Sequence, residues 1–243
     1  MTDLGIAAES LPDARLIEGL ADRLLVEGID WIEETAIADY RTWRGIATDP
    51  YLDIHGAWER ARQRFGQSLY GSFQGEPKAL EAQMYRAILF LFADEETPPS
   101  VVVISRDVDG EDERKTGFRQ AIAEKREYPF RCIIGALADP EIEAWIIAAW
   151  SPEDDGKKKT LATVRKALGF DPTLKPEKLT SRKRNDKKDA KRVLDKLCER
   201  GRRGQDRWRD AEIQRLRDRG QECGLAQFIY DVRNQLVPVL AKP

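Results

Sequence analysis

The sequence contains few of the residues that many enzymes use for catalysis. Its 243 residues include one histidine, His55, and three cysteines, Cys132, Cys198 and Cys223. A single histidine, placed just ahead of a helical pattern, argues against Ser–His–Asp and Cys–His catalysis and against histidine-rich zinc sites. The cysteines are odd in number and far apart, which argues against a disulfide framework or a paired zinc site. If the protein is an enzyme, we expect it to use carboxylates, lysines and a hard cation.

Long apolar runs are also lacking. No stretch approaches the roughly 18 apolar residues that a membrane helix needs. The first ten residues, MTDLGIAAES, lack the basic and apolar regions of a secretory signal. We therefore expect a cytoplasmic protein with no membrane partner.

The net charge of −2 conceals an uneven distribution of charge. Residues 156–219 contain 23 Lys and Arg against 10 Asp and Glu, a net charge of +13, whereas the rest of the chain has 18 against 33, a net charge of −15. An acidic core beside a basic region suits a protein that binds cations and holds a phosphate backbone. A solvated helical region with many ion pairs would give the same count.

Apolar runs alternate between strand-like and helical patterns along residues 1–150. We expect strands at 4–9, 28–34, 100–106 and 129–137, and helices at 10–28, 77–94 and 111–127. This order predicts an α/β fold with a mostly parallel, doubly wound sheet flanked by helices and joined by right-handed crossovers. Residues 141–150 fit a strand or a short helix.

We expect two domains, a core at 1–150 and a basic helical region at 151–243. Within the core, the mixed segment 36–76 is interpreted as an insertion. In the second domain the pattern predicts helices at 158–168, 186–200, 206–219 and 224–240.

Acidic residues follow three of the expected strands. Glu9 closes the first strand, Asp107 and Asp109 close the strand at 100–106, and Glu141 and Glu143 lie just past the next. Ligands of open α/β sheets bind beyond the carboxyl ends of the strands. Converging carboxylates repel one another unless a cation lies between them, and carboxylate ligands suit Mg²⁺ or Mn²⁺.

Each acid also has a purely structural interpretation. Glu9 could stabilise the start of the following helix, and Asp109 could serve the turn before Gly110. Glu141 or Glu143 could face solvent. Trp145 and Trp150 are expected in the core rather than as platforms for stacked bases.

Together, the segments GIAAES, VVVISRDVDG and ADPEIEAWIIA resemble the TOPRIM superfamily, which includes topoisomerases, bacterial primases and nucleases of the overcoming-lysogenization-defect class. The nearest likeness is to small TOPRIM-like bacterial proteins, including the RloB-like ones, which are often associated with phage defence. The resemblance covers residues 4–150 and extends to the segment NDKKDAKRVLDKL at 185–197. It departs from the family at Glu9-Ser10, where glycine usually follows the glutamate.

The resemblance implies a TOPRIM-like (Rossmann-like) α/β fold, and it assigns roles to the acids. Glu9 would be a general base or metal ligand, and Asp107 and Asp109 would bind Mg²⁺ or Mn²⁺. Glu143, with Glu141, would complete a second metal site or orient the scissile phosphate. Apart from the resemblance, the basic residues Lys187, Lys188 and Lys191 either line a phosphate channel or form a solvated face.

Three functions fit these features. The first is a metal-dependent nuclease that cleaves DNA or RNA, with a role in phage defence implied by the resemblance. The second is a non-catalytic subunit that binds nucleic acid or a partner protein and depends on a companion ATPase. The third, a sugar-nucleotide transferase of the DxD type, gives no role to Glu9 or to the EIEAW segment. The sequence leaves the oligomeric state open.

Overall fold

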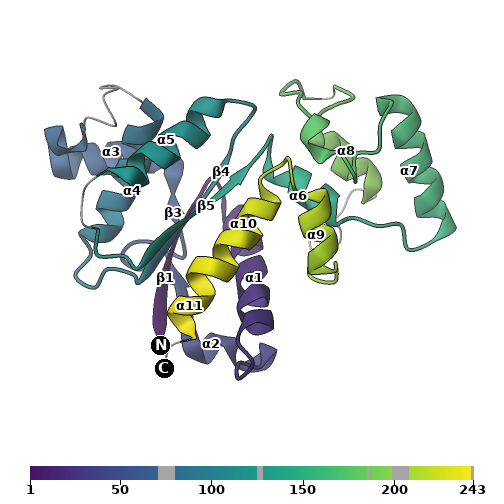
Figure 1. Ribbon diagram of the computed structural model, residues 1–243. Helices are drawn as coiled ribbons and strands as arrows, with labels where there is room; N and C mark the ends of the chain where they lie inside the picture. The colour runs from purple at the N-terminus through teal and green to yellow at the C-terminus, as the bar shows by residue number, and fades with distance from the viewer. Residues whose placement is uncertain (71–79, 125–127, 185, 199–207, 242–243) are drawn as a thin grey trace. The chain divides into compact units, whose positions relative to one another are not determined.

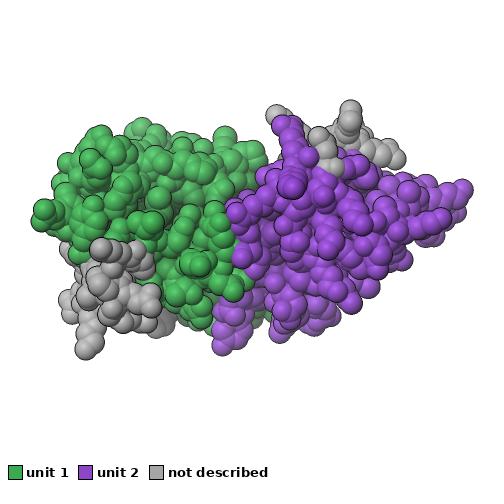
Figure 2. All heavy atoms as spheres, turned by 90° about the horizontal axis from the view of Figure 1, so that it is seen from above, with its two compact units in different colours: residues 1–106, 111–136, 231–243 green, residues 107–110, 137–230 purple. Residues whose placement is uncertain are grey.

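The computed structural model describes residues 1–70, 80–124, 128–184, 186–198 and 208–241 (Figure 1). The chain divides into two compact units, which Figure 2 distinguishes by colour. Unit 1 comprises residues 1–106, 111–136 and 231–243, and unit 2 comprises residues 107–110 and 137–230. The chain therefore passes between the units several times, and these bounds differ from the expected division after residue 150.

A mostly parallel sheet forms the centre of unit 1. The five strands are β1 (Thr2–Ala8), β2 (Arg41–Arg44), β3 (Leu52–Asp53), β4 (Val101–Asp107) and β5 (Cys132–Ala138). Their order is β2-β1-β4-β5, and β3 also pairs with β1. Strand β1 runs parallel to β2, β3 and β4, with Leu4 opposite both Trp43 and Val101. The predicted α/β class with a mostly parallel sheet is confirmed, as are the strands expected at 4–9, 100–106 and 129–137.

Helices cover both faces of this sheet (Figure 1). Helix α1 (Leu11–Gly28) connects β1 to β2 on one side of β1, whereas α4 (Leu80–Ala93) precedes β4 on the other side. Crossovers between parallel strands are right-handed. The connection from β1 to β2 and the connection from β3 to β4 run in opposite directions across the sheet, so their helices lie on opposite faces. Helices α3 (Ile54–Phe65) and α5 (Asp112–Ala123) pack on α4, while α1 packs on the π-helical turn η6 (Val232–Leu236) and on α11 (Val237–Leu240).

The turn from β1 into α1 confirms the predicted helix at 10–28. Ser10 is the N-cap residue, and its hydroxyl accepts a hydrogen bond from the Asp13 amide at 3.4 Å. The same hydroxyl donates to the Asp13 carboxylate at 2.7 Å. Pro12 lies in the first turn, where a missing amide hydrogen costs nothing. The residue that departs from the TOPRIM pattern thus serves here as a helix cap.

The prediction of a strand at 28–34 is wrong. Residues 29–33 form a turn, in which the Ile32 amide donates to the Ile29 carbonyl at 3.0 Å. Ile29 and Ile32 are buried while Trp31 is 50% exposed, so the apolar side chains recur every three residues rather than alternating. Short helical elements follow, η1 (Glu34–Ala36) and α2 (Ile37–Tyr40).

The segment interpreted as an insertion supplies strands to the sheet. Its described part, 36–70, contains β2, β3, α3 and η2 (Gly66–Leu69), and both strands pair with β1. Strand β2 lies at the edge of the sheet and carries polar side chains, which hides it from a hydrophobicity pattern. Two of these, Arg41 and Trp43, donate to the Asp22 carboxylate of α1, at 2.7 and 2.9 Å.

The other helices expected in the core are confirmed where the structure describes them. Helix α4 falls within the predicted 77–94, and α5 falls within 111–127. Residues 71–79 and 125–127, which include the start of the first prediction and the end of the second, lie outside the described residues.

Unit 2 is helical. It contains α6 (Ile142–Ala149), α7 (Asp155–Leu168), the turn η4 (Pro176–Lys178), α8 (Ala190–Leu197), α9 (Ile213–Arg219) and most of α10 (Leu225–Asp231). The segment 141–150 is therefore a helix rather than a strand. The helices predicted at 158–168 and 224–240 are confirmed. Those predicted at 186–200 and 206–219 are shorter than expected, because the described residues 186–189 and 208–212 precede α8 and α9 and are not helical. Residues 199–207 lie outside the described part of the chain.

The core of unit 2 contains the two tryptophans of the EIEAWIIAAW segment. Trp145 and Trp150 are buried, and Trp145 donates from Nε1 to the Cys223 carbonyl at 2.7 Å. The Trp145 ring also packs on Phe228 with centroids 5.4 Å apart. Their expected core role is confirmed. Among the described residues, no helix is long and apolar enough to cross a membrane.

Candidate metal centre

The turn after β4 brings Asp107 next to the start of α6. The Val108 amide donates to the Ala138 carbonyl at 2.7 Å, and the Asp109 amide donates to the Pro140 carbonyl at 2.8 Å. Asp109 and Gly110 both have positive φ, 56° and 69°. Aspartate and glycine adopt this left-handed conformation at lower cost than other residues, which explains the Asp-Gly pair at this turn.

Asp107 caps helix α6 from outside the helix. Its Oδ1 accepts a hydrogen bond from the Ile142 amide at 2.8 Å. The first amides of a helix have no partner within it, so a carboxylate here satisfies one of them and complements the helix dipole. Glu141 occupies the N-cap position of α6, and Glu143 lies in its first turn. Three acids therefore gather at one helix terminus.

The three carboxylates form a compact cluster within unit 2. One oxygen from each of Asp107, Glu141 and Glu143 lies within 4.8 Å of the others. The Glu141 and Glu143 side chains are only 12% and 17% exposed, so solvent screens their repulsion poorly. Such an arrangement favours a cation among the acids.

The side chain of Lys191 supplies one positive charge to the cluster. Its Nζ lies 2.7 Å from Glu141 Oε2 and 4.0 Å from Glu143 Oε1. Partial burial alone would lower the pKa of Lys191. The hydrogen bond to Glu141 and the charges of Glu143 and Asp107 outweigh that effect and raise this pKa above its ordinary value. Lys191 is therefore fully protonated at neutral pH.

Asp109 is not a member of the cluster. Its carbonyl accepts a hydrogen bond from Arg182, whose Nε also lies 4.0 Å from the Asp109 carboxylate. Of the Asp107-x-Asp109 pair, only Asp107 joins Glu141 and Glu143 within 4.8 Å. The sequence did not indicate the contact between Arg182 and Asp109, because the two residues are 73 positions apart and Arg182 lies in a stretch rich in lysine and arginine.

Glu9 lies outside the clustered carboxylates. It is half-buried and comes directly after β1, as expected, but it belongs to unit 1 whereas the cluster belongs to unit 2. The role that the resemblance assigns to Glu9 stays a prediction.

Two of the three predicted phosphate-binding lysines precede α8 rather than lying on it. Lys187 is exposed and Lys188 half-buried, in the turn before the N-cap residue Asp189. Only Lys191 is on the helix, and its ammonium contacts the acids. The sequence separates Lys191 from Glu141 by 50 positions, and no pattern in the sequence indicates this contact.

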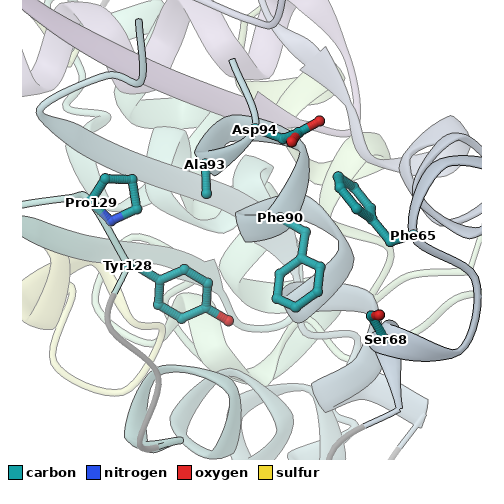
Figure 3. A pocket seen from close by; sticks show the side chains of 7 residues that line it. All are labelled: Phe65, Ser68, Phe90, Ala93, Asp94, Tyr128 and Pro129. Carbon is teal, nitrogen blue, oxygen red and sulfur yellow. The ribbon is translucent and has the colours of Figure 1, made fainter. Parts of the chain in front are cut away.

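A hollow in unit 1 has a different character. It has a volume of about 680 Å³ and is lined by Phe65, Ser68, Phe90, Ala93, Asp94, Tyr128 and Pro129 (Figure 3). Phe65 and Phe90 meet edge to face with ring centroids 5.4 Å apart. Asp94 is the one acid among these described lining residues, and Arg64 forms an ion pair with it. The described lining of the hollow is therefore mainly aromatic and apolar.

No family model, no curated protein and no solved structure matches this chain.

Proposed function

We propose that this chain is a Mg²⁺- or Mn²⁺-dependent phosphodiesterase that cleaves nucleic acid, built on a TOPRIM-like α/β core. The observation that carries the proposal is the convergence of Asp107, Glu141 and Glu143 within 4.8 Å in unit 2. Carboxylates of this kind, with water, are the ligands that hard divalent cations prefer.

The spacing of the three oxygens suits one divalent cation after a small contraction. Mg²⁺ binds oxygen at about 2.05 Å in octahedral geometry, so its ligand oxygens lie about 2.9 Å apart when adjacent and about 4.1 Å when opposite. The observed limit of 4.8 Å is slightly wider than this range. The three oxygens would have to approach one another by about 0.7 Å to fall within this range.

A cation bound there would polarise a phosphoryl oxygen and activate water for attack on phosphorus. The chain's own residues would position the substrate. Arg182 lies against the Asp109 carbonyl, and Lys187 and Lys188 belong to the same unit as the acids. These cations would hold the phosphate backbone of DNA or RNA.

A non-catalytic binding subunit is the second candidate. It is favoured by Ser10, which stands where the TOPRIM pattern has glycine and serves as the N-cap of α1. Such a subunit would bind nucleic acid or a partner protein, and turnover would depend on a companion ATPase. It would bind equally well in Mn²⁺ and in EDTA.

A cleavage assay distinguishes the two candidates. Purified protein is incubated with mixed DNA and RNA in Mn²⁺, Mg²⁺ or EDTA, alongside Asp107→Asn and Glu141→Gln. The matched control is Asp195→Asn, which removes an exposed carboxylate on α8. We expect cleavage that requires metal, is lost in the two cluster variants and is retained in the control. Salt-sensitive binding without cleavage, identical in EDTA, would contradict the nuclease and support the binding subunit.

A further inference from the structure

The carboxylate cluster in unit 2 already holds a cation that belongs to the chain. Lys191, the second residue of α8, places its ammonium 2.7 Å from Glu141 and 4.0 Å from Glu143. The ammonium therefore interacts with two of the three carboxylates that a divalent cation would use.

The two sides of this contact differ in their freedom to move. The Glu141 and Glu143 side chains are 12% and 17% exposed at the start of α6, a helix buried along most of its length. The Lys191 side chain is 62% exposed. A solvated lysine on a four-carbon stem forms weak, exchangeable ion pairs, whereas the two carboxylates have shorter side chains at a largely buried helix terminus. Lys191 is therefore the partner that can be displaced.

We propose that Lys191 is an exchangeable counter-ion, which neutralises Glu141 and Glu143 in the metal-free protein and is released when a divalent cation binds. This inference rests on the proposed metal-dependent function, and it adds that Lys191 regulates metal binding. Metal binding and release of the ammonium become one equilibrium, because both cations need the Glu141 carboxylate. Once released, the ammonium is exposed to solvent and can bind a substrate phosphate. Metal binding would therefore favour substrate binding.

The test is the affinity of Mn²⁺ for the whole chain, measured by calorimetry without nucleic acid. Lys191→Met keeps an apolar stem of similar length and removes the charge. Lys196→Met removes an exposed lysine from the last turn of the same helix and is the matched control. We expect Lys191→Met to lower the Mn²⁺ dissociation constant about fivefold, the size of a modest ion pair, while Lys196→Met leaves it unchanged.

A second readout guards against misfolding of the variant. In EDTA, Lys191→Met is expected to unfold at a lower temperature than wild type, because three acids then face one another without the ammonium. Mn²⁺ is expected to raise the unfolding temperature more in Lys191→Met than in wild type. Should Lys191→Met not fold even with Mn²⁺, Lys191→Gln replaces it in both measurements.

The outcomes separate this proposal from the proposed function. Equal Mn²⁺ affinity in all three proteins, or weaker affinity in Lys191→Met, would overturn the counter-ion role and leave the metal centre standing. No Mn²⁺ binding in any of them would overturn the metal centre as well. Mn²⁺ binding in Lys191→Met alone would support the counter-ion role in its strongest form.

Discussion

Asp107 has two roles, as the cap of helix α6 and as a proposed metal ligand, and two substitutions distinguish these roles. Its Oδ1 accepts from the Ile142 amide at 2.8 Å, and its carboxylate is one of the three clustered acids. Asp107→Asn keeps an oxygen that can accept this hydrogen bond and removes the negative charge. Asp107→Ala removes both. The difference between the two variants therefore measures the helix cap alone.

The loss of the helix cap sets the expected difference in stability between the two variants. Replacing a capping side chain by alanine costs about 0.5–2 kcal/mol in the free energy of unfolding. In a chain of this length, about 1 kcal/mol shifts the unfolding temperature by about 2–4 °C. In EDTA, we expect Asp107→Asn to unfold at or above the wild-type temperature, because one charge of a repelling cluster is gone. Asp107→Ala should unfold about 1–8 °C below Asp107→Asn.

Thermal unfolding in EDTA and in Mn²⁺, followed by circular dichroism, measures both roles. With Mn²⁺ at 100 times its dissociation constant, wild type should gain about 2.7 kcal/mol, and both variants should gain much less. The control, Asp195→Asn, should behave as wild type in both buffers. Equal unfolding temperatures for the alanine and asparagine variants in EDTA would refute the capping argument. An undiminished Mn²⁺ gain in Asp107→Asn would refute its role as a ligand.

Two further predictions concern other parts of the chain. Replacing both Lys187 and Lys188 by alanine should weaken binding to all nucleic-acid sequences alike. In a filter-binding titration, the slope of the logarithm of the binding constant against the logarithm of the salt concentration should fall in magnitude by about 1–2. An unchanged slope would show that these lysines do not contact the phosphates. Desolvation by burial raises the pKa of Cys132, with a contribution from the Asp231 charge, and that of Cys223, each to about 12. Both thiols should therefore be alkylated by iodoacetamide at pH 8 about a thousandfold more slowly in the folded protein than in urea, and rapid labelling of either in mass spectrometry would contradict the described packing.

The sequence predicted most of the sheet because its central strands are continuous apolar runs. Val101–Ile104 and Leu4–Ala8, apart from Gly5, are hydrophobic and, as the structure confirms, buried in strands with neighbours on both sides. Strand β2 was missed because an edge strand needs no apolar face, and Arg41 and Trp43 instead bind the Asp22 carboxylate of α1. The false strand at 28–34 arose from Ile29 and Ile32, whose three-residue spacing belongs to a turn.

Part of the candidate site could be predicted because its acids follow recognisable strands. Asp107, Glu141 and Glu143 could be found because each follows a recognisable strand, and acids in such positions converge in α/β sheets. Asp109 was expected to join them, but its positive φ and its contact with Arg182 belong to the turn. The contact between Lys191 and Glu141 depends on how α8 packs on α6 in unit 2, and local sequence patterns do not encode such packing.

A crystal structure of the protein grown with Mn²⁺, with an anomalous difference map recorded above the manganese absorption edge, would locate a bound cation. We expect a peak within coordination distance of Asp107, Glu141 and Glu143, with the Lys191 ammonium moved away from Glu141. A map without a peak at these carboxylates, with Lys191 still in contact with Glu141, would rule out the proposed metal centre.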